Sequence, residues 1–157
     1  TSLFNFDGSL WVVAGFNQHD VWRYTEPPEI FYSKPVGDIK STLGWGTSPD
    51  GSGMAPTDFN LPNQIFVLAN RETFYVSDTV RISGSGSKLI VGNGTDPVAL
   101  NIQPTGNVQA TIDVSEGASL YVQSSSIPDL GQLGLNSNVT FYSNDDVTIL
   151  GVTVGTP

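Results

Sequence analysis

The sequence contains no cysteine, which excludes disulfide bonds, thiolate metal sites and a cysteine nucleophile. Basic residues are few: six Lys and Arg stand against 15 Asp and Glu, for a formal net charge of −9. Nucleic acids and anionic membranes attract clustered Lys and Arg, and here the six are scattered. No run approaches the roughly 20 apolar residues that a membrane helix needs. We therefore expect neither nucleic-acid binding nor membrane insertion.

Helical patterns are also lacking. No window repeats apolar residues at the i, i+3, i+4, i+7 spacing over three turns. Short runs of Val, Ile, Thr, Phe and Tyr instead alternate with polar residues, which is the period of a β-strand. The 17 glycines and ten prolines supply turns between these runs. The sequence predicts an all-β protein, and its 157 residues are enough for a single domain with a sizeable core.

Two segments of the second half share one arrangement of strands and turns. Residues 79–91 (TVRISGSGSKLIV) and 111–122 (TIDVSEGASLYV) each read as two alternating strands around a small-residue turn, and they start 32 residues apart; residues 139–150 (VTFYSNDDVTIL) are a weaker third copy. The alternation assigns one set of residues to a buried face: Val80, Ile82, Leu89, Val91, Ile112, Val114, Leu120, Val122, Val139, Phe141, Val147 and Ile149. Repeats that each bury one face predict a short parallel β-solenoid. A β-sandwich with hairpins at the same turns is the alternative.

The first third of the chain has a different character. We expect residues 1–60 to form an aromatic-rich, irregular β segment that caps the solenoid repeats of residues 61–157, both within one domain spanning 1–157. Trp45 stands in a loop rich in Gly, Ser and Pro, residues 42–56. The open end of a solenoid exposes apolar surface and strand edges, so we predict that Trp45 covers the first rung. Sugar binding by Trp45 is the alternative.

Two stretches resemble a known module. FYSKPVGDIKSTLGWGTSPDGSGMAPTDFNLPNQIFVLANR, followed by FYVSDTVRISGSGSKLIVGNGTDPVALNI, is similar to a module of large, repeat-rich exported proteins of the Bacteroidota. The resemblance covers roughly residues 31–143, and residues 1–30 depart from it. It implies export to the cell surface by the type IX route and a non-enzymatic scaffold or adhesive role. The chain opens on Thr1 without a basic leader, so we expect any signal peptide to have been removed or to lie outside this sequence.

Modification sites are suggested by short motifs. Asp78-Thr79-Val80 resembles the Asp-Ser/Thr-aliphatic site at which Bacteroidota attach O-glycans, which makes Thr79 a candidate attachment point. Thr79 as an ordinary strand residue is the alternative. Asn93-Gly94-Thr95 and Asn138-Val139-Thr140 match the N-glycosylation sequon, a triplet that also occurs by chance.

Catalytic and metal-binding patterns are weak. His19, the single histidine, neighbours Asp20, but no nucleophile-elbow sequence accompanies the pair. A glycosidase needs two acids across a cleft, and most acids here read as turn residues. Asp113 lies within a predicted strand, where alternation turns it toward solvent. Calcium is the best metal candidate, at the turns around Asp50 and at residues 143–146, although neither matches a known calcium loop. We expect no enzymatic activity and no required cofactor.

Two further residue sets suggest binding. Exposed aromatics stack on sugar faces, and Trp11, Trp22, Tyr24 and Tyr32 could form such a platform or belong to the core. Both ends of the sequence read as apolar strands with little to cover them, which invites pairing between copies or strand donation. The residues of these candidate assembly strands are Leu10, Trp11, Val12, Val13, Val147, Ile149, Val152 and Val154.

These observations favour a structural or adhesive module of an exported bacterial surface protein, in the form of a self-assembling filament subunit or one unit of a tandem stalk. Its partners would be copies of itself or neighbouring modules, and its location extracellular. A carbohydrate-binding module with glycan partners is the alternative. A fragment of a β-helical polysaccharide lyase or hydrolase is a third hypothesis, weakened by the lack of a basic residue near paired acids.

Overall fold

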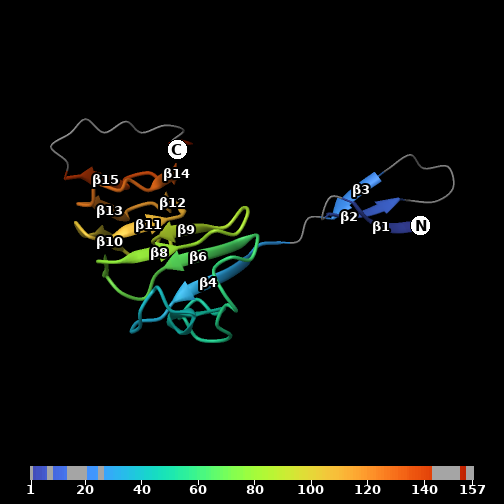
Figure 1. The fold of residues 1–157 in the computed structure, drawn as a ribbon, viewed down its shortest axis with the longest axis horizontal. Coiled ribbons are helices and arrows are strands. Elements are labelled where there is room, and N and C mark those ends of the chain that lie inside the picture. The colour runs from blue at the N-terminus through green and yellow to red at the C-terminus, as the bar shows by residue number, and fades with distance from the viewer. Residues whose placement is uncertain (1, 7–8, 14–20, 25–26, 143–152, 155–157) are drawn as a thin grey trace.

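The computed structural model is an all-β chain, with 41% of residues in strands and 3% in helix (Figure 1). It describes residues 2–6, 9–13, 21–24, 27–142 and 153–154. Most of its strands pair in parallel and form a β-solenoid of roughly three turns. This arrangement confirms the predicted fold class and decides against the β-sandwich, whose sheets would be antiparallel.

The described strands form four sheets. An antiparallel N-terminal sheet has the order β1 (Ser2–Phe6), β2 (Ser9–Val13), β3 (Val21–Tyr24). The long sheet has the order β16 (Thr153–Val154), β14 (Asp129–Leu133), β12 (Thr111–Val114), β9 (Lys88–Val91), β6 (Gln64–Leu68), β4 (Glu29–Ser33), β5 (Trp45–Gly46). The middle sheet has the order β15 (Asn138–Phe141), β13 (Ser119–Val122), β10 (Ala99–Ile102), β7 (Thr73–Val76). The short sheet pairs β11 (Asn107–Gln109) with β8 (Thr79–Arg81), and the 3-10 helix η1 (Thr42–Gly44) precedes β5.

In two successive rungs the chain passes through the long, middle and short sheets in turn and adds one strand to each; among the described strands, the later rungs add strands to the long and middle sheets alone. β6, β7 and β8 make one rung, and β9, β10 and β11 make the next. β12 and β13 follow, and β14 and β15 form the last of these rungs, at the upper left of Figure 1. Because paired strands lie about 4.8 Å apart, residues in register form straight columns along the stack.

Alternation along each strand places apolar side chains in one core shared by the three parallel sheets. Phe66, Leu89 and Ile112 form an inward column of the long sheet, and all three are fully buried. The predicted inward residues from Val80 to Val122 are buried as expected. Val139 and Phe141 are partly buried against the same core, while Val147 and Ile149 lie outside the described residues.

The predicted repeat unit is wrong, although its buried residues are right. A 32-residue repeat would stack residues 79–91 directly on residues 111–122. In the structure β9 instead stacks on β12, with Lys88 opposite Thr111, and β8 stacks on β11. Registered residues are 23 positions apart from β9 to β12 but 18 apart from β12 to β14, because corner lengths differ. A period of two marks inward positions but does not specify which strands are neighbours.

The first rung is covered as predicted. Trp45 in β5 is fully buried, and its ring meets Phe66 of β6 edge to face at 5.1 Å between centroids. Phe31 of β4 stacks on the same phenylalanine at 5.4 Å, and Phe59 packs on it at 5.2 Å. β5 runs antiparallel to β4 and ends the sheet on this side. Trp45 is therefore part of the core and does not present a sugar-binding surface.

Parallel pairing begins before the expected start of the solenoid at residue 61. β4 pairs in parallel with β6, with Glu29 opposite Gln64, so the long sheet already includes residues 29–33. The N-terminal sheet shares no strand pairing with the other sheets in the described part of the chain. Figure 1 shows β1, β2 and β3, in blue at the right, standing apart from the strands of the solenoid.

Candidate functional site

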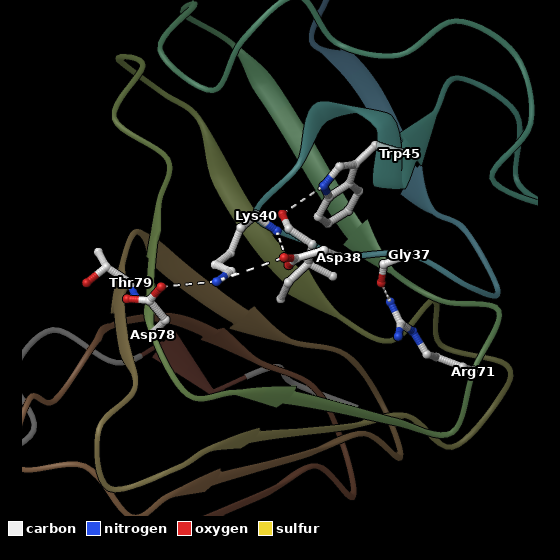
Figure 2. A network of polar contacts seen from close by, with 8 residues as sticks. Gly37, Asp38, Lys40, Trp45, Arg71, Asp78 and Thr79 are labelled. Carbon is white, nitrogen blue, oxygen red and sulfur yellow. Dashed lines mark hydrogen bonds and ion pairs between the residues drawn. The ribbon is translucent and has the colours of Figure 1, made fainter.

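The candidate modification residue Thr79 lies at the surface. It is the first residue of β8, where its exposed side chain alternates with the buried Val80. Its backbone N–H donates to Asp78 Oδ1 at 2.7 Å. Lys40 Nζ, from the loop before η1, donates to the other carboxylate oxygen of Asp78 at 3.1 Å (Figure 2). The hydroxyl-bearing residue is thus accessible and stands on an ordered corner of the coil.

Polar contacts attach the loop before η1 to the solenoid beside this corner. The indole Nε1 of Trp45 donates to Ile39 O at 3.0 Å, and Arg71 donates to Gly37 O at 2.7 Å (Figure 2). The Arg71 guanidinium also lies 4.1 Å from the centre of the Phe74 ring, a cation–π contact. These contacts link the cap to the strands of the first full rung.

Charge pairing perturbs the ionisable groups of this corner. The hydrogen bond from Thr79 N–H and the nearby Lys40 ammonium together hold the pKa of the Asp78 carboxyl below its usual value. The same pairing, chiefly the hydrogen bond to Asp78, raises the pKa of Lys40. Both groups are solvent exposed, so the pair orients the corner without adding much stability.

A separate open groove of about 660 Å³ lies between the short and long sheets, and its lining does not include Asp78 or Thr79. Its lining is mostly polar and includes Ser87, Gln109, Thr111 and Asp129. Asp129 is the single acidic residue among its lining residues, and Lys88 the single basic one. Hydrolysis of a glycosidic bond uses two carboxyl groups across the cleft, a pair that this lining does not provide.

Asp113 departs from the expectation of a solvated strand residue. It is 7% exposed, and its carboxylate accepts hydrogen bonds from Lys88 Nζ at 2.5 Å and from the backbone N–H of Gln132 at 2.7 Å. The register between β12 and β14 shifts at this point, and the backbone of Gly131 lies against Asp113 Oδ1. The prediction fails because neighbouring strands supply a cation and a bulged backbone that cover the carboxylate.

The predicted aromatic platform is divided by the register of the N-terminal sheet. Trp11 is opposite Arg23, whereas Val12 is opposite Trp22 and Leu10 is opposite Tyr24. Paired positions share a face and successive positions alternate. Trp22 and Tyr24 therefore occupy positions on one face, and Trp11 a position on the other. Tyr32 belongs to β4 in a different sheet.

The candidate assembly strands are also placed differently from one another. Residues 10–13 lie in β2, which pairs with β1 on one side and β3 on the other, so its edges are already used. Val154 lies in β16 and is opposite Leu133 of β14. Val147, Ile149 and Val152 fall outside the described residues.

Metal and catalytic candidates find little support in the described residues. No group of three or more His, Cys, Asp or Glu side chains gathers there in a metal-binding arrangement. Asp50 instead accepts hydrogen bonds from the side chain and from the backbone N–H of Ser52, and these lower the pKa of its carboxyl. His19, Asp20 and residues 143–146 lie outside the described part of the chain.

Three tyrosines that sequence reasoning did not single out lie on the outer side of the middle sheet. Tyr75 of β7 is 65% exposed, and Tyr142, just after β15, is 60% exposed. Tyr121 of β13 is half-buried, with its ring 6.5 Å from that of Tyr142. The alternation of residues 73–76 and 119–122 could have identified Tyr75 and Tyr121 as outward residues. Their common face becomes evident once strand stacking is known.

The chain matches no family model, no curated protein and no solved structure at a significant level. Within the described residues, no helix is long and apolar enough to cross a membrane.

Proposed function

We propose that the chain is a non-enzymatic structural or adhesive module of an exported bacterial surface protein, and that it assembles end to end as a rod. The observation that carries the proposal is the difference between the two ends of the parallel stack. At the β5 end, Trp45 and Phe59 cover the first rung. At the β15 end, the inward residues are less well covered.

The contrast is clearest in the middle sheet. Leu120 and Val122 of β13 are almost completely buried, but their register partners Val139 and Phe141 in β15 are only partly buried. In the described part of the chain, β15 pairs with β13 and with no strand on its other side. A parallel edge with partly exposed apolar residues is suited to receive another rung. A second copy or a neighbouring module supplies that rung in the proposed rod.

A matched pair of Leu→Lys variants tests the end-to-end contact. Leu135 lies in the turn between β14 and β15 at the open end, and Leu43 lies in η1 at the capped end; both are exposed, so neither substitution buries a charge. We expect Leu135→Lys to abolish concentration-dependent assembly in sedimentation velocity and negative-stain electron microscopy, and Leu43→Lys to preserve it. Monomeric wild-type protein at all concentrations, or assembly that Leu135→Lys leaves intact, would contradict the proposal.

Strand donation by the N-terminal sheet is a separate mode of assembly. Because β2 is already paired on both sides, a donated strand would have to come from an edge of this sheet, β1 or β3. Deletion of residues 1–13 removes β1 and β2, so it would abolish assembly by donation of β1 and leave stacking through β15 unchanged.

A carbohydrate-binding module remains the second candidate, and the register of the N-terminal sheet makes it testable. Trp22 and Tyr24 hold same-face positions on β3, and Trp11 holds an opposite-face position on β2. If this face binds sugars, Trp22→Ala abolishes binding on a glycan array, while Trp11→Ala does not.

The proposal that Thr79 carries an O-glycan is supported by the exposure of its side chain. Mass spectrometry of the protein from its native source tests the proposal: the glycan mass should be present on the wild type and absent from Thr79→Ala.

A further inference from the structure

We infer that the outer face of the middle sheet binds a neutral, extended polysaccharide, with Tyr75 and Tyr121 as stacking platforms and Asn101 between them. The inference stands on the geometry of this face and holds whether or not the module assembles into rods. The sugar site is distinct from the N-terminal sheet and from Trp45.

The spacing of the aromatic residues is the first argument. Tyr75 is opposite Asn101 in β10, and Asn101 is opposite Tyr121 in β13, so the three form one outward column. Strands in register are about 4.8 Å apart, which places the two tyrosines about 10 Å apart along the stack. An extended β-1,4-linked disaccharide has a similar length. Alternate sugar rings of such a chain would therefore meet successive tyrosines.

The chemistry of the column is the second argument. A tyrosine ring offers an apolar surface for the C–H face of a sugar and a hydroxyl for hydrogen bonding. Asn101 Oδ1 accepts a hydrogen bond from Gln123 Nε2 at 3.2 Å, which orients the amide between the two rings. Within the described residues, Asn101 Nδ2 has no hydrogen-bond partner and can donate to a sugar hydroxyl.

The charge of the face is the third argument, and it decides the class of ligand. The chain as a whole carries a net charge of −9. The outward positions of the four strands nevertheless carry no charged residue: Thr73, Tyr75, Ala99, Asn101, Ser119, Tyr121, Asn138 and Thr140. The nearest acids in sequence to β7, Glu72 and Asp78, lie outside the strand. An uncharged, hydrogen-bonding face on an acidic protein fits an uncharged polymer better than an anionic or cationic partner.

The outer side of the long sheet provides an internal comparison. Its outward positions include the Lys88–Asp113 ion pair, and Asp129 stands at the start of β14. That face lacks an exposed aromatic column in the described residues. The two faces of the solenoid therefore differ: the middle sheet has the uncharged surface and the aligned tyrosines that sugar stacking requires, and the long sheet does not have them in the described residues.

The experiment measures binding of the intact chain to microcrystalline cellulose by co-sedimentation and to cellohexaose by calorimetry. We expect wild-type binding, a loss of about tenfold in affinity for Tyr75→Ala and for Tyr121→Ala, and full retention for Val36→Ala, a control at an exposed residue of the cap. Tyr75→Trp should keep or strengthen binding because the indole also offers an aromatic surface on which a sugar can stack. Tyr75 is exposed, so its variants should fold normally, as circular dichroism can verify.

Several results would overturn the inference. One is that the wild type binds neither cellulose nor cellohexaose, and another is that the double variant Tyr75→Ala/Tyr121→Ala binds them with the affinity of the wild type. A third is that the wild type binds anionic polygalacturonate more strongly than cellohexaose. A fourth is that Trp22→Ala loses binding while Tyr75→Ala keeps it. A change of oligomeric state in the tyrosine variants without a change in sugar binding would assign the face to a second copy of the chain and would equally exclude the glycan site.

Discussion

At the scale of single residues, the aromatic side chains of this chain differ in how far they are buried. Trp45 stands in a loop rich in Gly, Ser and Pro, yet it is fully buried, with its indole N–H bonded to a backbone carbonyl. Tyr75 stands in a regular strand and is mostly exposed. The environment assembled by the fold, more than local composition, decides whether an aromatic residue packs in the core or faces a partner.

Trp45→Ala should destabilise the protein by about 3–5 kcal/mol, the usual cost of removing a large aromatic from a core. The variant loses the contact with Phe66 and leaves a cavity at the first rung. Chemical denaturation followed by circular dichroism measures the change in the free energy of unfolding. Trp45→Phe, which retains an aromatic ring but loses the pyrrole part of the indole and its N–H, should lose less. Equal stability of Trp45→Ala and the wild type would show that the cap is not part of the cooperative core.

At the scale of elements, the least regular strand pairing is that of β12 with β14. Every other rung of the long sheet continues in simple register, but here the register shifts between Ile112 and Val114. The Asp113 carboxylate accepts the hydrogen bond of Gln132 N–H at this point. A side chain thus satisfies a backbone donor where the ladder is interrupted, as buried polar groups require.

Asp113→Ala should lower the free energy of unfolding by about 1–3 kcal/mol, because it leaves the Gln132 N–H and the Lys88 ammonium without their shared acceptor. Asp113→Asn keeps an acceptor for the Gln132 N–H and should lose less. Denaturant titration ranks the variants, and hydrogen exchange at the Gln132 amide reports locally. Faster exchange in Asp113→Ala than in Asp113→Asn is the expected result; identical exchange in the two would contradict the role of the carboxylate.

At the scale of the whole molecule, the chain is a short stack with one capped end and a high negative charge. Parallel ladders run along the stack, and each rung contacts mainly its neighbours, so further rungs can be added without changing those already formed. End-to-end contact between copies must overcome repulsion between bodies that each carry −9.

Salt should therefore promote the proposed assembly. At about 0.01 M ionic strength charges interact over roughly 30 Å, and at about 0.15 M over roughly 8 Å, so repulsion between copies is screened while apolar contacts persist. Sedimentation velocity at the two ionic strengths should show larger species at the higher one. Dissociation with added salt would indicate that opposite charges, not the apolar rung at β15, hold the copies together.

The sequence by itself determined the local properties of this protein. Alternating apolar residues specified strands and their inward faces, because a period of two is a property of each strand alone; Val80 and Leu120 were correctly assigned in this way. The tertiary structure decided what depends on neighbours. The two similar segments begin in different sheets, β8 in the short sheet and β12 in the long sheet, so β9 and not β8 stacks on β12. A local pattern does not encode this assignment of strands to sheets. The same stacking buries Asp113, aligns Tyr75 with Tyr121, and leaves β15 at the edge of the middle sheet, since each of these results from which strands become adjacent in space.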